Sequence, residues 1–432
     1  MSVTTRSLAS ALAAVLGADG LRDDAAALAA AAVDGSPPRW IAVPATADQL
    51  AQVLALARED ELAVVPRGSG AGLEQGAPPR RVDLVVDLRR LDAVIEHNPD
   101  DLTISVQAGL TAGALAARLA PHRQALPLDP PGWSGRTLGG IAATHASGPL
   151  RVRYGTMRDL LLGVRFVQAD GVLTWGGARV VKSVTGYDVP KLMVGSLGTL
   201  GVLVELTLRL HPVPDVERTW LAMLRSPAQA QEAVARLLDS TVQPSRVEML
   251  DDRALAACGL PVAGAALAVS IATVEPAVRA QEDALTELVR RVGGRTEPLG
   301  ASFWHLYDRT LAAPGGVMLR IGTVPSRLGD TFTEIRQALA GAAVAGCAAL
   351  GALRARVDAG DVTMLTRGIE RLRAAVADVD GGVIVERGPR TLREAIDPWG
   401  PVPAPALAVM RAIKQEFDPA GALNPGRFVG GL

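Results

Sequence analysis

The chain of 432 residues has few of the side chains that hold metal ions or form disulfide bonds, with two cysteines and five histidines. Cys258 and Cys347 lie far apart and fit no metal-ligand spacing, so we expect the protein to work in a reducing compartment. No two histidines are closer than 23 residues. These absences exclude a metal centre or an iron–sulfur cluster encoded by a local motif.

Long apolar runs and an excess of charge are absent as well. No stretch reaches the roughly 18 to 20 apolar residues that a membrane-spanning helix requires. The formal net charge is −1, which gives no electrostatic footprint for nucleic acid. Lysine is scarce, with 3 lysines against 41 arginines, a skew that we attribute to base composition. We therefore expect neither a nucleic-acid partner nor a membrane span.

Glycine is abundant instead, and its first cluster follows the short apolar run 62–65. The cluster reads Pro66-Arg-Gly-Ser-Gly-Ala-Gly-Leu73, and such glycines let the backbone turn several N–H groups toward an anion. A Walker A loop is excluded because no Gly-Lys-Ser/Thr follows. A dinucleotide-binding βαβ unit is excluded because the nine residues before Val82 contain two prolines and cannot form its helix. The loop is predicted to hold phosphate by main chain alone, against the alternative of a plain surface turn.

Two further glycine clusters make the surface-turn alternative less attractive. One occupies residues 130–155, with small residues where a flat ring would need close approach of the backbone. The other occupies residues 195–202 and leads into the predicted strand 203–210. Three separated glycine loops, each beside a strand, predict one extended cofactor that the main chain holds at several points.

The order and spacing of these motifs resemble the FAD-binding domains of the vanillyl-alcohol oxidase type, also called PCMH-type. Within that family the chain is most similar to the FAD-binding subunits of bacterial glycolate oxidases, and the tail 417–431 supports this. The matching pieces are the loop 66–70, Thr137-Leu-Gly-Gly140, Ser147-Gly148, Tyr154-Gly155, Thr185-Gly-Tyr-Asp-Val-Pro-Lys191 and Gly198-Thr-Leu-Gly-Val202.

The resemblance implies FAD, held without a covalent bond because the first loop has neither His nor Cys. It places the pyrophosphate at residues 68–70, the ribityl chain and ring near residues 137–140, and the adenine or ribose side near Val202. The implied cofactor-binding residues are Pro66, Arg67, Gly68, Ser69, Gly70, Gly72, Leu73, Pro131, Thr137, Leu138, Gly139, Gly140, Ala143, Ser147, Gly148, Tyr154, Gly155, Gly201 and Val202.

The predicted elements mix helices and strands without regular βα alternation, which favours the α+β class. We expect a helical segment at 1–38, a PCMH-type FAD-binding domain of two subdomains at 39–213, and an α+β cap-like domain at 214–403. The cap-like domain is predicted to be an antiparallel sheet covered by helices on one face. The tail 404–432 has too few apolar residues to pack alone, and the resemblance implies that it returns to the FAD domain.

The catalytic residues are harder to predict. Oxidation of a hydroxy acid needs a base for the hydroxyl proton and a cation for the carboxylate. His145 is near the flavin motifs, but a structural, hydrogen-bonded histidine is the competing interpretation. His305 lies among aromatic residues and fits packing, while Arg320 fits a carboxylate but is one of 41 arginines. The catalytic residues therefore stay unassigned, and no metal site is predicted.

By resemblance, the chain is expected to support oxidation of glycolate, a small 2-hydroxy acid, to glyoxylate. Its partners would be a catalytic flavosubunit and an iron–sulfur subunit that take the electrons. Residence in the cytoplasm is expected, with contact to the inner membrane only through partners. The alternatives are a self-sufficient 2-hydroxy-acid dehydrogenase and a mainly structural assembly subunit. A reductase of cell-wall precursor synthesis is disfavoured because its substrate-domain acid and serine have no counterpart.

Overall fold

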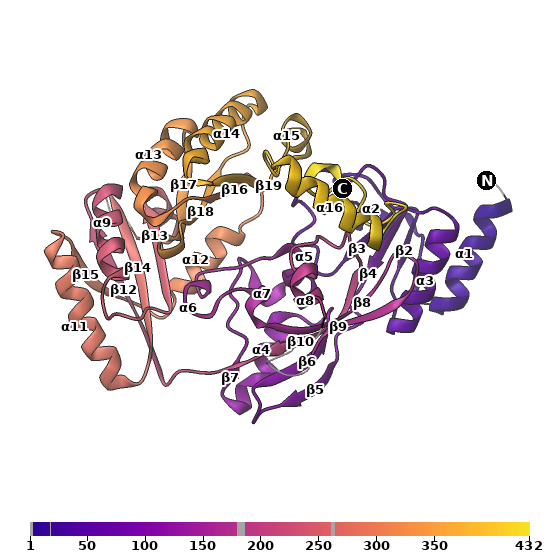
Figure 1. The fold of residues 1–432 in the computed structure, drawn as a ribbon, viewed down its shortest axis with the longest axis horizontal. Coiled ribbons are helices and arrows are strands. Elements are labelled where there is room, and N and C mark those ends of the chain that lie inside the picture. Colours follow the sequence, from indigo (N-terminus) through magenta and orange to yellow (C-terminus); the bar gives the residue numbers. More distant parts are fainter. Residues whose placement is uncertain (1–2, 18, 179–185, 261–263) are drawn as a thin grey trace.

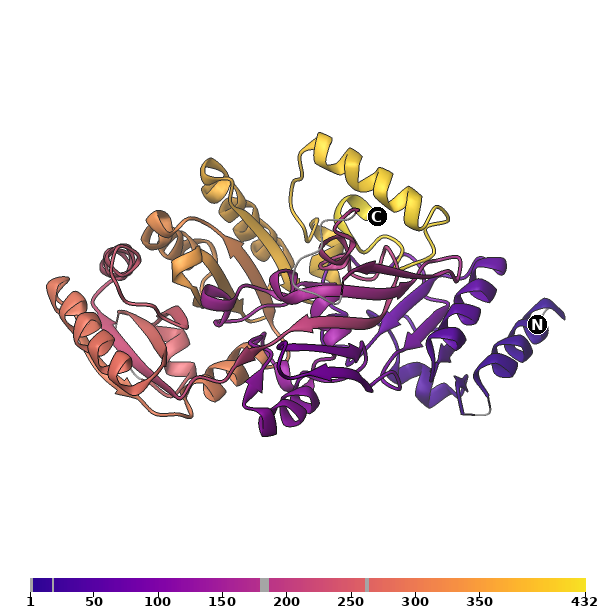
Figure 2. The ribbon, with the colours of Figure 1, turned by 60° about the horizontal axis from the view of Figure 1, so that its bottom comes forward.

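A computed structural model describes residues 3–17, 19–178, 186–260 and 264–432. Figure 1 shows two lobes side by side, the first half of the chain in indigo to magenta and the second in orange. The yellow C-terminal helix lies with the first lobe (Figures 1 and 2). This mixture of helices and sheets confirms the α+β prediction.

The N-terminal part of the first lobe is a four-stranded sheet in the order β1-β2-β4-β3, in which β4 pairs in parallel with β2 and β3. Helix α3 begins where the Thr46 hydroxyl accepts a hydrogen bond from Gln49 N at 3.1 Å, as an N-cap does. It delivers the chain into β3 at the centre of the lobe. The elements are α1 (Val3–Leu16), β1 (Leu21–Arg22), α2 (Ala25–Ala30), β2 (Trp40–Ala42), α3 (Ala47–Glu59), β3 (Val64–Arg67) and β4 (Leu84–Asp87).

The rest of the first lobe is a five-stranded antiparallel sheet in the order β5-β6-β10-β8-β9, with a small β11-β7 pair beside it. Helix α5 packs on this sheet and begins at the N-cap Thr137. The strands are β5 (Val94–Asn98), β6 (Thr103–Gln107), β7 (Gln124–Ala125), β8 (Leu161–Val167), β9 (Leu173–Gly177), β10 (Val202–Arg209) and β11 (His211–Pro212). The helices are α4 (Ala112–Leu119), α5 (Leu138–Thr144), α6 (Arg151–Tyr154), α7 (Met157–Leu160) and α8 (Val189–Met193).

The second lobe is one eight-stranded antiparallel sheet in the order β15-β12-β14-β13-β17-β18-β16-β19. Helices α9, α11, α13 and α14 cover one face and form its main core. The strands are β12 (Val216–Leu224), β13 (Arg246–Asp251), β14 (Ala265–Thr273), β15 (Arg295–Leu299), β16 (Val317–Gly322), β17 (Ala343–Cys347), β18 (Ala352–Val357) and β19 (Gly382–Arg387). The four helices are α9 (Pro227–Leu238), α11 (Glu275–Arg291), α13 (Leu328–Ala338) and α14 (Val362–Val376).

The opposite face of this sheet is divided in two. Helices α10 (Asp252–Ala257) and α12 (Phe303–Ala312) cover the half formed by β12, β14 and β13 with a smaller apolar core. The half formed by β18, β16 and β19 carries arginines instead, and it approaches the first lobe: Arg354 donates to the Ser147 carbonyl at 3.0 Å. The expectation of helices on one face is therefore correct for the main core, while α10 and α12 add a partial layer.

The tail returns to the first lobe, as the resemblance implied. After α15 (Arg390–Ala395), helix α16 (Ala404–Phe417) places the Phe417 ring 6.1 Å from that of Phe166. The chain then runs beside β3, where Ala422 and Asn424 exchange backbone hydrogen bonds with Val64 at 2.8 and 2.9 Å. The tail thus pairs with the strand that leads into the first glycine loop.

A buried ion pair fixes the turn that follows α16. The Lys414 ammonium contacts Asp418 at 2.6 Å and also donates to the carbonyls of Thr199 and Leu423. Asp418 is 1% exposed and accepts from the backbone N–H groups of Ala422 and Leu423. Because every charge in this turn has hydrogen-bond partners, the pair specifies the path of the tail rather than straining it.

Glu248 is a buried acid of the second lobe. It lies on β13 with 3% of its surface exposed, and the Tyr307 hydroxyl donates a hydrogen bond to its carboxyl group. Burial penalises the ionised form and raises the pKa of Glu248 to about 8. Its folded-state pKa is thus above its unfolded value, so the folded protein holds a proton that the unfolded chain releases between the two values.

The stability that Glu248 contributes is present below its ordinary pKa and is lost as the pH rises toward 8. We expect Glu248→Gln to remove this loss, reducing the fall in unfolding free energy between pH 5 and 8 by roughly 1 kcal/mol per pH unit. Urea denaturation at four pH values measures it. The exposed Glu370→Gln is the control, and parallel curves for wild type and Glu248→Gln would show that the prediction is wrong.

Candidate functional site

The first glycine loop presents a row of backbone donors. Strand β3 ends in register with β4, where Arg67 pairs with Asp87, and the loop then turns with φ +86° at Gly70. Within the described part of the chain, no group accepts a hydrogen bond from the N–H groups of residues 68–72. Free N–H groups converging in a turn form a cradle for an anion.

Two small cavities lie along this loop. The loop cavity, of about 70 Å³, is lined by Pro66, Arg67, Gly68, Ser69, Gly70, Ala71, Gly72, Leu73, Arg136, Thr137, Gly140, Ala143, Thr144, Leu197, Asn424 and Arg427. The inner cavity, of about 60 Å³, is lined by Pro66, Arg67, Gly68, Leu88, Ala108, Thr137, Gly139, Gly140, Ala143, Gly198, Gly201, Val202 and Leu203. Since they share six lining residues, they form one elongated hollow between the loop and the start of β10.

Positive charge without a full counter-charge surrounds the loop cavity. Arg427 is 2% exposed, and its guanidinium donates to the carbonyls of Leu73 and Gln75 at 2.6 and 3.0 Å. Burial lowers the pKa of Arg427 to about 10. The buried Nε atoms of Arg427 and Arg67 have no hydrogen-bond partner among the described residues. An anionic group in the cavity would pair with both guanidinium groups.

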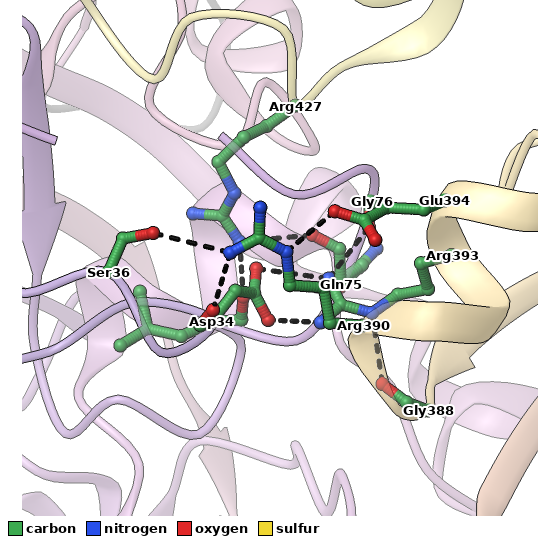
Figure 3. A network of polar contacts seen from close by, with 10 residues as sticks. Asp34, Ser36, Gln75, Gly76, Gly388, Arg390, Arg393, Glu394 and Arg427 are labelled. Atoms are coloured by element: carbon green, nitrogen blue, oxygen red, sulfur yellow. Dashed lines mark hydrogen bonds and ion pairs between the residues drawn. The ribbon is translucent and has the colours of Figure 1, made fainter. Parts of the chain in front are cut away.

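The loop is held in place by a network that joins all parts of the chain (Figure 3). Arg393 of α15 forms a buried ion pair with Asp34 and donates to the Gly76 carbonyl at 3.1 Å. Arg427 reaches the adjoining Gln75 carbonyl from the tail. The second lobe and the tail thus both hydrogen-bond to the end of one glycine loop, and the N-terminal segment holds the second-lobe arginine in place through Asp34.

A larger cavity of about 280 Å³ opens between the lobes and continues from the loop cavity through Gly70, Gly72 and Arg136. We call it the interdomain cavity. Its first-lobe wall includes Gln75, Pro131, Gly132 and Ala146, and its second-lobe wall includes Leu311, Met318, Arg354, Glu386 and Arg387. The three connected cavities suit one long cofactor with a small molecule at its interdomain end.

The second-lobe wall is charged. Arg354 and Glu386 form an ion pair at 2.9 Å in which both side chains are largely buried. Burial alone would raise the pKa of Glu386, but the charge of Arg354 outweighs it and lowers the pKa to about 2. Burial lowers the pKa of Arg136 and of Arg387, which share the cavity. Glu386 is therefore ionised at neutral pH and serves Arg354 as a counter-charge.

The structure brings most of the predicted cofactor residues together along the loop and inner cavities, and Pro131 lines the interdomain cavity. Leu138 is fully buried in the core. Ser147 accepts from Arg151 at 3.3 Å, and Gly148 packs so closely on Asp129 that a Cβ would lie 1.8 Å from its carbonyl oxygen. Ser147 and Gly148 therefore fit a contact between the two lobes. Thr185, which belongs to another motif of the resemblance, lies outside the described residues.

Tyr154 and Gly155 lie elsewhere. The Tyr154 ring packs against His211 at 5.0 Å and lines an apolar cavity of about 400 Å³ with Leu115, Leu126 and Trp133. Gly155 ends α6 with φ +77°. Neither residue lines the three connected cavities, so the structure does not bring this pair to the glycine loop.

The three weak catalytic candidates do not gather at one point. His145 caps α5 with φ 50°, its Nε2 is 3.0 Å from the Thr156 hydroxyl, and burial together with the charge of Arg320 lowers its pKa. His305 is exposed at the rim of a separate pocket with Trp304. Arg320 lies on β16, next to Arg354 in register. His145 thus makes the kind of hydrogen bond that its competing, structural interpretation predicts.

The lining residues that were not predicted include Arg136, Asn424 and Arg427 of the loop cavity. Asn424 and Arg427 belong to the Leu-Asn-Pro-Gly-Arg run of the tail, which was noted only as a mark of resemblance. Asn424 adopts φ 46° and accepts from Arg427 at 3.2 Å. The sequence did contain a signal for them. Asn424 and Arg427 are polar residues that stand among a proline, two glycines and apolar residues that are buried, a pattern that is unusual for a free tail.

Comparison with known proteins agrees with this geometry. Residues 38–177 match the family described as FAD binding domain, and residues 213–304 and 402–428 match the C-terminal domain of FAD linked oxidases. The probable mitochondrial D-lactate dehydrogenase of Danio rerio is 28% identical over 90% of this chain and 84% of the relative. Glycolate oxidase subunit GlcD of Escherichia coli is 26% identical over 90% of this chain and 83% of that protein.

Among solved structures, p-cresol methylhydroxylase with substrate bound superposes with a TM-score of 0.77 at 15% identity, covering 99% of this chain and 97% of that one. At this identity the likeness shows the fold, which is PCMH-type as predicted. The two family matches define a FAD-linked oxidoreductase. The chain belongs to the FAD-linked oxidases, with FAD as its cofactor.

The described residues also bear on two other kinds of partner, metal ions and membranes. No three His, Cys, Asp or Glu side chains in that part of the chain gather closely enough to hold a metal ion. None of its helices has both the length and the apolar character to cross a membrane.

Gly70→Val should lower FAD affinity at least tenfold, because a β-branched residue resists φ +86° and fills the anion cradle. FAD titration followed by flavin fluorescence measures this. Gly259→Val is the matched control, since Gly259 has φ +76° and open space but lies in the second lobe. Equal FAD affinity of Gly70→Val and wild type would contradict the placement of the phosphate.

Arg427→Met should weaken FAD binding by about 10- to 100-fold, the scale of a charge-assisted hydrogen bond. Arg427→Lys, which keeps the charge, should recover part of the loss. The exposed Arg411→Met of α16 is the control for net charge. Unchanged FAD affinity in a folded Arg427→Met protein would show that this guanidinium does not face the phosphates.

FAD should be released completely when the protein is precipitated with acid, because the loop 66–70 offers no His or Cys for a covalent bond. The absorbance of the supernatant and of the redissolved pellet measures this. Flavin colour that stays with the pellet would reveal a covalent link.

Proposed function

We propose that the chain is the FAD-binding subunit of an oxidase complex that acts on a small 2-hydroxy acid, with oxidation of glycolate to glyoxylate as its reference reaction. The observation that carries the proposal is the interdomain cavity, which continues from the phosphate loop and is lined by Arg136, Arg354 and Arg387. The names of the relatives, a D-lactate dehydrogenase and a glycolate oxidase subunit, support the same substrate class.

Bound FAD would supply the acceptor for the hydride that leaves carbon 2 of the hydroxy acid. Arg136 precedes the N-cap of α5 and lines both the loop cavity and the interdomain cavity. Its Nε donates to the Pro131 carbonyl at 2.8 Å, which orients the guanidinium. Arg136 is thus placed to bind the substrate carboxylate beside the cofactor.

The second requirement, a base for the hydroxyl proton, is not met by the acids and histidines that line the interdomain cavity in the described chain. Glu386 has a pKa of about 2 and is committed to Arg354, and Glu74 is exposed to solvent. His145 is bound to Thr156 instead. This supports a division of work in which a catalytic flavosubunit completes the substrate chemistry that this cavity cannot perform alone and an iron–sulfur subunit receives the electrons.

A self-sufficient 2-hydroxy-acid dehydrogenase is the second candidate. The interdomain cavity favours it because its volume of about 280 Å³ has room for a small substrate next to the cofactor. The two proposals differ in one measurable property, which is turnover by the isolated chain.

The isolated, FAD-loaded chain should oxidise glycolate at less than about one hundredth of the rate of the complex assembled with a catalytic flavosubunit and an iron–sulfur subunit. The lack of a base in the cavity is the physical reason, since a general base contributes about 10²- to 10⁴-fold. Dye-linked glycolate oxidation on samples of equal flavin content measures it. Full activity of the isolated chain would establish the dehydrogenase alternative.

His145→Ala and His305→Ala should each lower turnover of that complex by less than about fivefold, because neither side chain lines the interdomain cavity. The measurement is kcat at matched flavin content. A loss of 10² or more in either variant, the scale expected for removing a base, would contradict the assignment of structural roles.

A further inference from the structure

The open half of the second-lobe sheet concentrates positive charge on the face that meets the first lobe. Arg320 on β16 is the register partner of Arg354 on β18, and Met318 is the partner of Arg356. Alternate residues of a strand share a face, so Met318 and Arg320 point the same way, as do Arg354 and Arg356. Since Met318 and Arg354 line the interdomain cavity, this face forms its roof.

Only part of this charge is neutralised. The carboxylate of Glu386 is the counter-charge of Arg354 and also lowers the net field at Arg320 and Arg136. Glu74, the other acid that lines the cavity, is exposed and acts on Arg387 from the rim. Asp308 also acts on Arg136, and Arg356 of the same sheet face acts on Arg387. With Arg320 and Arg356 included, five guanidinium groups face three carboxylates, which leaves about two positive charges.

Two of these guanidinium groups lie on opposite walls. Arg136 comes from the first lobe, next to the cofactor loop. Arg387 comes from β19 of the second lobe, where its Nη2 donates to the Ala313 carbonyl at 2.7 Å. The Nε of Arg387 is buried and has no hydrogen-bond partner among the described residues. A buried donor without an acceptor costs roughly 1 to 3 kcal/mol, and an anionic ligand in the cavity would remove that cost.

We propose that the interdomain cavity selects 2-hydroxy acids that carry a second carboxylate, with Arg136 binding the carboxylate next to carbon 2 and Arg387 binding the distal one. The proposal rests on the proposed function and refines its substrate class. A dicarboxylate supplies the two negative charges that the cavity lacks, whereas glycolate supplies one. Arg387 is therefore a specificity-determining residue.

The test uses ligands that differ by one carboxylate and are not 2-hydroxy acids, so binding is measured without turnover. The FAD-loaded chain is titrated with succinate and with butyrate, and the change in flavin absorbance and the heat of binding are recorded. Wild type should bind succinate at least tenfold more tightly than butyrate. Glutarate and pentanoate repeat the comparison with one more carbon.

Arg387→Met should weaken succinate binding at least tenfold while changing butyrate binding less than twofold, because butyrate needs only Arg136. Arg387→Lys keeps the charge and should keep the preference for succinate. Arg371→Met is the control for net charge, since Arg371 pairs with Glu334 on the outer helices and is 49% exposed. Flavin content is measured for each variant, so that loss of FAD is separated from loss of ligand binding.

Equal affinities for succinate and butyrate in wild type would overturn the inference and leave the proposed function intact. An unchanged preference in Arg387→Met would overturn the role of Arg387, and a shift in flavin midpoint potential as its only effect would assign this charge to the cofactor instead. The proposed function is tested separately by glycolate turnover of the assembled complex. Absence of that activity would contradict the proposed function, whereas absence of selectivity would contradict only the inference about dicarboxylates.

Discussion

The burial of the Arg427 guanidinium is the constraint on which the site depends. A buried cation without its counter-charge is costly, and a fold that keeps one must compensate it. The tail is fixed through Lys414 and Asp418 and by backbone pairing with Val64, and Arg427 then reaches the carbonyls of the first loop. Carbonyls satisfy hydrogen bonds but carry no full charge. We expect the diphosphate of FAD to carry that charge, so that the glycine loop, the tail and the cofactor would form one electrostatic unit.

The two lobes use different chemistry at their junction. The first lobe offers mainly main-chain N–H groups and small residues, which require backbone shape rather than particular side chains. The second lobe contributes charged side chains from a sheet face, of which Arg354 and Arg387 line the cavity. Side chains on a sheet face can change without altering the fold, whereas a loop shape cannot. The cofactor site can therefore persist while substrate selection diverges.

The fold could be predicted well from the sequence, because the signals that specify its helices, strands and turns lie within short stretches of the chain. The N-cap Thr46, the glycine loop after β3 and the α+β class all follow from residues near each other in the chain. The role of Arg427 depends on a partner about 350 residues away, which no local pattern reveals. Tyr154 was assigned to the flavin motifs by the family resemblance, whereas in the structure its ring, at the end of α6, packs against His211.

Two buried acids of the second-lobe sheet show how burial and pairing together set the charge of its open face. Glu386 faces Arg354 and has a pKa of about 2, whereas Glu248 faces Tyr307 and has a pKa of about 8. Both interact with Arg354, yet at neutral pH only Glu386 offsets its charge. Had both been ionised, the surplus of positive charge at the interdomain cavity would be smaller by one. The burial of Glu248, which outweighs the pKa-lowering hydrogen bond from Tyr307, therefore helps to keep this face cationic at neutral pH, where carboxylate ligands are ionised.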